Sequence, residues 1–124
     1  NKNKRKKIKE EKVKNLLIEN NFNFIHDKKI INDCCFKYRP DFLFDCDNYF
    51  IVLEIDEDAH DSYDKECEII RMNNISIGLG LPCKFIRYNP DNKNFKKQEK
   101  LINILNENLY KEMLDNIEVQ YLFY

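Results

Sequence analysis

The sequence contains no apolar run long enough to span a membrane, and no segment resembles a signal peptide. We therefore expect a soluble, intracellular protein, cytoplasmic or nuclear, with no membrane partner. Glycine is also scarce. The stretch Gly78-Leu79-Gly80-Leu81-Pro82 lacks the Gly-Lys-Ser/Thr ending of a phosphate-binding loop, so we expect it only to separate a helix from a strand.

No two cysteines have the C-x-x-C spacing. The chain has five of them, Cys34, Cys35, Cys46, Cys67 and Cys83. An odd number in an intracellular chain argues against a disulfide scaffold. A structural zinc ion needs about four ligands, usually at tighter spacing. Cys34 and Cys35 with Cys46 or Cys67 and a histidine could still meet in space, so a zinc-stabilised interaction domain is one alternative. Free, mostly buried thiols are the expected state.

Length and charge predict one domain over residues 1–124 with a basic pole. The hydrophobic content of 43% is sufficient for a core, and the net charge is −1. Basic side chains nevertheless crowd the start of the chain: Lys2, Lys4, Arg5, Lys6, Lys7, Lys9 and Lys12. Such a pole can bind phosphates locally, or it can be a frayed, solvated helix end over residues 1–6. The chain begins with Asn, as a domain excised from a longer protein would.

Two apolar segments around a polar turn are the most informative stretch. Arg39-Pro40-Asp41-Phe42-Leu43-Phe44-Asp45 and Ile51-Val52-Leu53-Glu54-Ile55-Asp56-Glu57 are rich in aromatic and β-branched residues, which favours two strands. Asp47-Asn48 suits a two-residue turn, because both residues tolerate positive φ. Such a turn makes Cys46 face Tyr49, and it places Asp41 opposite Glu54.

Three acids then share one face of this predicted hairpin. Opposed residues point to the same side and strand side chains alternate, so Asp41, Glu54 and Asp56 converge. Clustered carboxylates repel one another and are costly to desolvate without a positive charge among them. Mg²⁺ takes hard oxygen ligands, typically one or two carboxylates plus substrate phosphates. We therefore expect these acids to bind Mg²⁺ or Mn²⁺; the alternative is a solvated strand end with its acids in water.

The pattern of Pro40-Asp41, a short hairpin and Glu54-x-Asp56 resembles the PD-(D/E)XK nuclease superfamily. The continuation is similar to a narrower branch, which holds the very short patch repair endonucleases, the EDxHD homing endonucleases and nuclease-like proteins of large DNA viruses. That continuation is Glu54-Ile55-Asp56-Glu57-x-x-His60, Glu68-x-x-Arg71 and Phe85-Ile86-Arg87-Tyr88. The resemblance covers about Glu10 to Tyr88. Asp56 stands in place of the superfamily lysine, which that branch often lacks too.

The resemblance implies roles for further residues. A histidine near the position of His60 takes part in catalysis in such nucleases, and a neutral imidazole transfers protons well near pH 7. An acid from the first helix often joins the site, which points to Glu10, with Glu11 as the fallback; both could instead be surface glutamates. Glu68 and Arg71 lie one helical turn apart, so they share a face. Arg71 either forms a surface ion pair or lies near the acids, where it orients a carboxylate or meets a phosphate.

The periodicity predicts an α/β fold, restriction-endonuclease-like by resemblance, with helices beside a mixed central sheet. We expect helices over 7–20, 63–74 and 95–115, a first strand over 22–31, the acidic hairpin, and a strand over 83–88 beside its central arm. Residues 118–124 suit an edge strand or a partner-binding tail. His26 is expected to be a packed or surface residue rather than a ligand.

These observations predict a Mg²⁺-dependent endonuclease that acts on DNA, as a homodimer or with a fused DNA-binding domain. Asp41 and Glu54 would hold the metal, with Asp56 as a third ligand or a water-orienting group. The basic N-terminal segment, Lys84 and Arg87 would contact the DNA backbone. The main alternative is a nuclease-fold module that binds nucleic acid or protein without cutting it.

Overall fold

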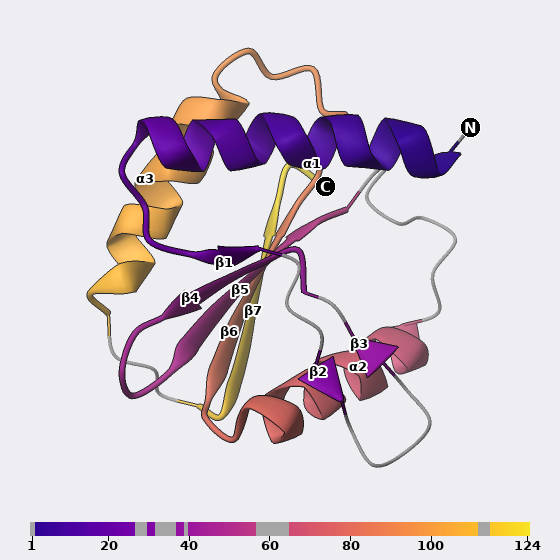
Figure 1. The fold of residues 1–124 in the computed structure, drawn as a ribbon, viewed down its shortest axis with the longest axis vertical. Helices are drawn as coiled ribbons and strands as arrows, with labels where there is room; N and C mark the ends of the chain where they lie inside the picture. The colour runs from indigo at the N-terminus through magenta and orange to yellow at the C-terminus, as the bar shows by residue number, and fades with distance from the viewer. Residues whose placement is uncertain (1, 27–29, 32–36, 39, 57–64, 112–114) are drawn as a thin grey trace.

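The computed structural model describes residues 2–26, 30–31, 37–38, 40–56, 65–111 and 115–124. This part of the chain has a mixed α/β fold, with a five-stranded sheet of order β1-β4-β5-β6-β7 and a two-stranded sheet of β2 and β3 (Figure 1). The helices are α1 (Lys2–Glu19), α2 (Lys65–Leu79) and α3 (Lys97–Leu109). The strands are β1 (Ile25–His26), β2 (Ile30–Ile31), β3 (Lys37–Tyr38), β4 (Phe42–Asp45), β5 (Phe50–Ile55), β6 (Cys83–Tyr88) and β7 (Ile117–Leu122).

The acidic hairpin has the predicted register. Strands β4 and β5 are antiparallel, and Phe42 pairs with Leu53. The Cys46 N–H donates to the Tyr49 carbonyl at 3.0 Å, and Asp47 has a φ of 67°, as a two-residue turn requires. Strand β6 has the predicted bounds and lies parallel to β5. Strand β7 then pairs with β6 in parallel, which confirms an edge strand at the C-terminal end.

Helices cover both faces of this sheet, so it lies in the middle of three layers (Figure 1). Helices α1 and α3 pack on one face, where Leu17 and Leu101 contact a core that includes Phe42 of β4. Helix α2 packs on the other face through Met72 and Ile75. Because strand side chains alternate, each strand residue faces either the α1 and α3 side or the α2 side.

Several predicted element bounds are wrong. The expected strand over 22–31 is divided between β1 and β2, which belong to different sheets. Helix α1 begins at Lys2 instead of residue 7, α2 continues to Leu79, and α3 spans only Lys97–Leu109. Helix α1 ends at Glu19, within one residue of the predicted end at residue 20. Asn21 has a φ of 62°, and the Phe22 N–H donates to the Leu17 carbonyl at 3.0 Å, which is a Schellman cap.

Gly80 ends α2 in the left-handed conformation. Its φ is 75°, and its N–H donates to the Ser76 carbonyl at 2.9 Å. A Cβ built at Gly80 would meet no heavy atom within 4 Å, so a substitution there is penalised by the backbone alone. We expect Gly80→Ala to lower the free energy of unfolding by about 1 kcal/mol. Gly80→Asn should lower the free energy of unfolding by less, because Asn tolerates this conformation. If urea titrations gave the same loss for both variants, this account would be wrong.

No helix in the described ranges combines the length and apolar character that crossing a bilayer requires.

Candidate functional site

Three neighbouring strands each place one charged side chain at the same level of the sheet. The β4–β5 register, continued by one residue, sets Asp41 beside Glu54, and Glu54 pairs with Arg87 of β6. All three side chains point to the α2 side and are almost fully buried, with exposed fractions of 5%, 3% and 2%. Together with nearby charged residues they form what we call the charged cluster: Asp41, Glu54, Asp56, Glu68, Arg71 and Arg87. Its charges interact strongly, because little water separates them.

Asp41 closes the open end of the hairpin. Its Oδ2 accepts a hydrogen bond of 2.8 Å from the backbone N–H of Ile55. This bond extends the contact between the two arms beyond Phe42, where the β4 ladder begins. The hairpin backbone therefore holds the Asp41 carboxylate next to that of Glu54.

Glu54 is a buried acid that forms an ion pair with Arg71 of α2. Burial raises the pKa of Glu54 to about 7; the Arg71 guanidinium opposes this rise, and the Asp41 carboxylate adds to it. The Arg71 Nη1 atom lies 2.9 Å from Glu54 Oε1, but the contact is an ion pair without hydrogen-bond geometry. Among the described residues this oxygen accepts no hydrogen bond. An ionised Glu54 is therefore paired with the Arg71 charge, and a divalent cation would add a second positive charge beside the Glu54 and Asp41 carboxylates.

Asp56 is held by a different cation. The Arg87 Nε atom donates to Asp56 Oδ2 at 2.5 Å, and Nη2 donates to Oδ1 at 3.1 Å. The remaining Nη1 atom donates to Glu68 of α2. Burial alone would lower the pKa of Arg87, but these hydrogen bonds outweigh it and raise that pKa. Both oxygens of Asp56 are thus bound in a buried, bidentate ion pair.

The described residues do not form the expected site of three carboxylates. No three His, Cys, Asp or Glu side chains within these ranges come together as a metal-binding group. The physical reason is Arg87, which engages both oxygens of Asp56. Asp41 and Glu54 remain side by side and offer the hard oxygen ligands that Mg²⁺ prefers. Two carboxylates are also the usual protein contribution to a Mg²⁺ site that shares a phosphate.

Glu68 and Arg71 lie one turn apart on α2, as predicted, but they contact different partners. Arg71 reaches Glu54, and Glu68 reaches Arg87. Arg71 therefore lies beside the acids, as one of the two alternatives expected. Orientation of a carboxylate, the first role expected for it there, stays a prediction. The other role, contact with a phosphate, stays a prediction.

The structure places the helix acids on the opposite side of the sheet. Glu10 Oε2 lies 2.8 Å from Nε2 of His26 on β1, and the His26 ring stacks on Phe42 at 4.9 Å. Phe42 belongs to the core beneath α1, whereas Asp41 and Glu54 face α2. Glu11 is exposed. The expected catalytic histidine, His60, lies outside the described residues.

The expected contacts of Lys84 and Arg87 with DNA stay predictions, but the structure places the two residues on opposite faces of the sheet. Arg87 is buried and bound to Asp56 and Glu68. Lys84 faces the other side of the sheet, where its Nζ donates to Asn108 Oδ1 on α3. Three positions separate the two residues along one strand, so they cannot share a face. In the basic segment, the side chains of residues 1–7 are outside the description, and Lys9 pairs with Asp91 at 2.5 Å.

The described cysteines do not assemble a zinc site. Cys46, Cys67 and Cys83 are free thiols, and no metal-binding group exists among the described residues. Cys34 and Cys35, which the zinc alternative requires, lie outside them. Burial raises the pKa of Cys83 to about 11, so this thiol is protonated near neutral pH.

The description of the charged cluster depends on the geometry of this chain alone. No family model, no curated protein and no solved structure matches the chain.

Proposed function

We propose that this protein is a metal-dependent endonuclease that hydrolyses DNA phosphodiester bonds at Asp41 and Glu54. The observation that supports this most is the placement of two buried carboxylates, Asp41 and Glu54, side by side on the hairpin. Burial is the main reason that the pKa of Glu54 is raised, and repulsion from the Asp41 carboxylate adds to it. A divalent cation shared with a substrate phosphate would relieve this repulsion. We also propose a restriction-endonuclease-like fold, in line with the mixed sheet and its three layers.

In this proposal each described residue of the cluster has a separate task. Asp41 and Glu54 hold the cation, which when bound supplies positive charge to the phosphate oxygens. Arg71 orients Glu54, since its guanidinium lies 2.9 Å from Oε1. Asp56 anchors Arg87 instead of acting as a ligand. Proton transfer by His60 remains a prediction of the sequence, as do the DNA partner and a homodimer or fused DNA-binding domain.

A second candidate function is binding without hydrolysis. The observation that favours it is internal neutralisation: Arg71 pairs with Glu54, and Arg87 pairs with Asp56 and Glu68. These contacts stabilise the acids without any metal. A nuclease-fold module that binds nucleic acid or protein would require no more than this.

Cleavage assays with plasmid and branched DNA distinguish the two candidates. We expect wild-type protein to cut with Mg²⁺ or Mn²⁺, and EDTA to abolish cutting. Asp41→Asn should remove the activity, because it halves the negative charge available to the cation. Asp45→Asn is the matched control: Asp45 is exposed at the other end of β4 and should be dispensable.

If wild-type protein cuts no DNA or RNA substrate, or if Asp41→Asn cuts as well as wild type, the hydrolase proposal is wrong. Gel-shift titrations of the same substrates would then test the binding module.

A further inference from the structure

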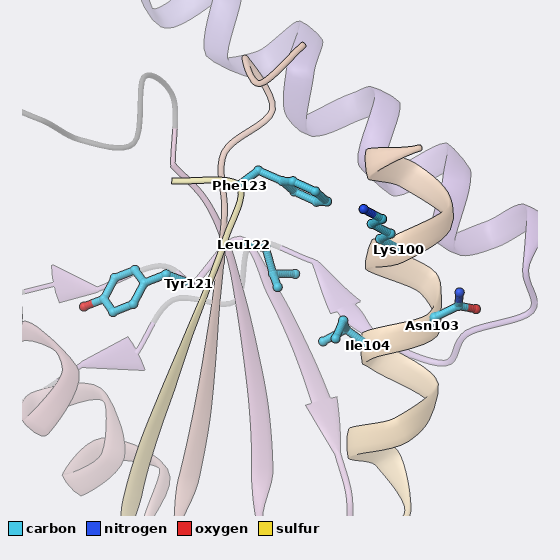
Figure 2. Close-up of a pocket in the computed structure, with 6 residues that line it drawn as sticks. All are labelled: Lys100, Asn103, Ile104, Tyr121, Leu122 and Phe123. Atoms are coloured by element: carbon cyan, nitrogen blue, oxygen red, sulfur yellow. The ribbon is translucent and has the colours of Figure 1, made fainter. Parts of the chain in front are cut away.

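The row of side chains that contains Asp41, Glu54 and Arg87 continues onto the edge strand. In the parallel β6–β7 register Arg87 pairs with Tyr121. Ile117 and Val119, at alternate positions of β7, pack against the core beneath α2, so Tyr121 faces the α2 side as well. Figure 2 shows the Tyr121 ring directed away from the side where Leu122 and Phe123 approach α3. A tyrosine thus stands on the same face and at the same level as the two acids.

Tyr121 is exposed where the charged members of the row are buried. Its exposed fraction is 54%, and Tyr124 beside it is 50% exposed. The two ring centroids lie 4.8 Å apart with an interplanar angle of 66°, so the edge of one ring contacts the face of the other. We call these two residues the aromatic pair. Strand β7 is two strand spacings from β5, which places the Tyr121 backbone about 10 Å from that of Glu54.

We propose that the aromatic pair stacks against an unpaired base of a nucleic acid whose phosphate lies at Asp41 and Glu54. This inference rests on the proposed function and specifies its substrate class: nucleic acid with a single-stranded segment, loop or flap next to the bond that is cut. Exposed aromatic rings are the usual platforms for single-stranded bases, and stacking on them tolerates any sequence. The separation of about 10 Å from Glu54 lets a single strand reach both positions within a few nucleotides.

The substrate must contain an unpaired base, because the bases of a continuous duplex already stack on their neighbours on both faces. A ring on the rim of a protein surface can pair only with a base that has left the stack. Tyr121 occupies such a rim, since β7 is the edge strand of the sheet. Blunt duplex DNA therefore gains nothing from the aromatic pair.

The absence of tryptophan from the chain allows a direct test. Tyr121→Trp keeps a stacking ring and introduces a single fluorescent indole. We expect an oligothymidylate of about 15 nucleotides to quench this fluorescence, and a blunt duplex of equal length to quench it much less. The matched control is Tyr110→Trp, since Tyr110 is 90% exposed at the C-terminal end of α3, away from the row. Its emission should not respond to either oligonucleotide.

Tyr121→Ala supplies the complementary measurement. Its half-saturating concentration for the oligothymidylate should rise about tenfold, with duplex binding unchanged. Quenching without any cleavage by wild type would support the aromatic pair and remove the hydrolase. Two results would overturn the stacking proposal alone. One is cleavage by wild type without any quenching in Tyr121→Trp. The other is an equal loss of affinity for single-stranded and duplex DNA in Tyr121→Ala. Neither cleavage nor quenching would overturn both.

Discussion

Glu54→Gln is expected to abolish metal-dependent cleavage and at the same time to make the protein relatively more stable as the pH rises. The two effects have one origin, which is a carboxylate buried beside another carboxylate. The neutral amide of this variant removes half of the proposed ligand pair. Because loss of a residue that merely supports a metal ligand costs about 10- to 100-fold in affinity or activity, loss of a ligand itself should cost about a hundredfold or more.

The direction of the pH effect follows from the pKa of Glu54, which burial raises from 4.5 to about 7. A group with a raised pKa in the folded state binds its proton more tightly there than in the unfolded chain. Its stabilising contribution is therefore complete below pH 4.5 and is lost as the pH rises through 7. The shift corresponds to about 3 kcal/mol. The amide does not titrate, so the difference in unfolding free energy, variant minus wild type, should increase by about this amount between about pH 4.5 and about pH 8.

Urea titrations at several pH values measure this difference. Glu107→Gln is the matched control, since Glu107 is exposed on α3 and its removal deletes the same charge. If the variant-minus-wild-type difference changed with pH as much for Glu107→Gln as for Glu54→Gln, the effect would not depend on burial of the acid. Parallel curves for wild type and Glu54→Gln would show that Glu54 titrates alike in the folded and unfolded states, and the account of the buried acid pair would be wrong.

The contacts that the sequence predicted correctly are local ones. The two-residue turn at Asp47-Asn48 fixes every pair in the hairpin, so Asp41 beside Glu54 followed without knowledge of the rest of the fold. The apolar run from Cys83 to Tyr88 is bounded by Pro82 and Asn89, which set the ends of β6. In both cases the residues that end the strands lie within a few positions of them in the sequence.

The contacts that the sequence did not predict depend on distant segments. Arg87 and Asp56 are 31 positions apart, and their pairing depends on the parallel register of β5 and β6, two strands that α2 separates along the chain. Arg87 alone, in a short strand, looks like a surface residue. Tyr121 enters the row in the same way, through the parallel β6–β7 register. Alternation shows which residues share a face, but the register between parallel strands is set by the connecting helix and the core.

Arg87→Met is expected to destabilise the protein by about 3 to 5 kcal/mol, which is the usual cost of removing one partner of a buried ion pair. Methionine fills a similar volume but leaves Asp56, with a side chain only 1% exposed, without its bidentate partner. Glu68 loses the same guanidinium. Asp56 keeps its buried charge but loses this cation, so the loss should exceed that of a typical surface substitution several-fold. Urea denaturation near pH 7 gives the value directly.

Two further variants separate the cost of the unpaired charge from the value of the pair. Arg87→Lys keeps a cation but not the planar fork that binds both oxygens of Asp56, so it should cost less than Arg87→Met yet more than a surface change. In the double variant Arg87→Met with Asp56→Asn the buried charge is gone, and the loss should be smaller than the sum of the two single losses. If the single losses simply add, Asp56 does not depend on Arg87 for its burial. Asp56 would then be available as the third cation ligand, and the division of the charged cluster into an Asp41–Glu54 site and an Arg87-centred support would be wrong.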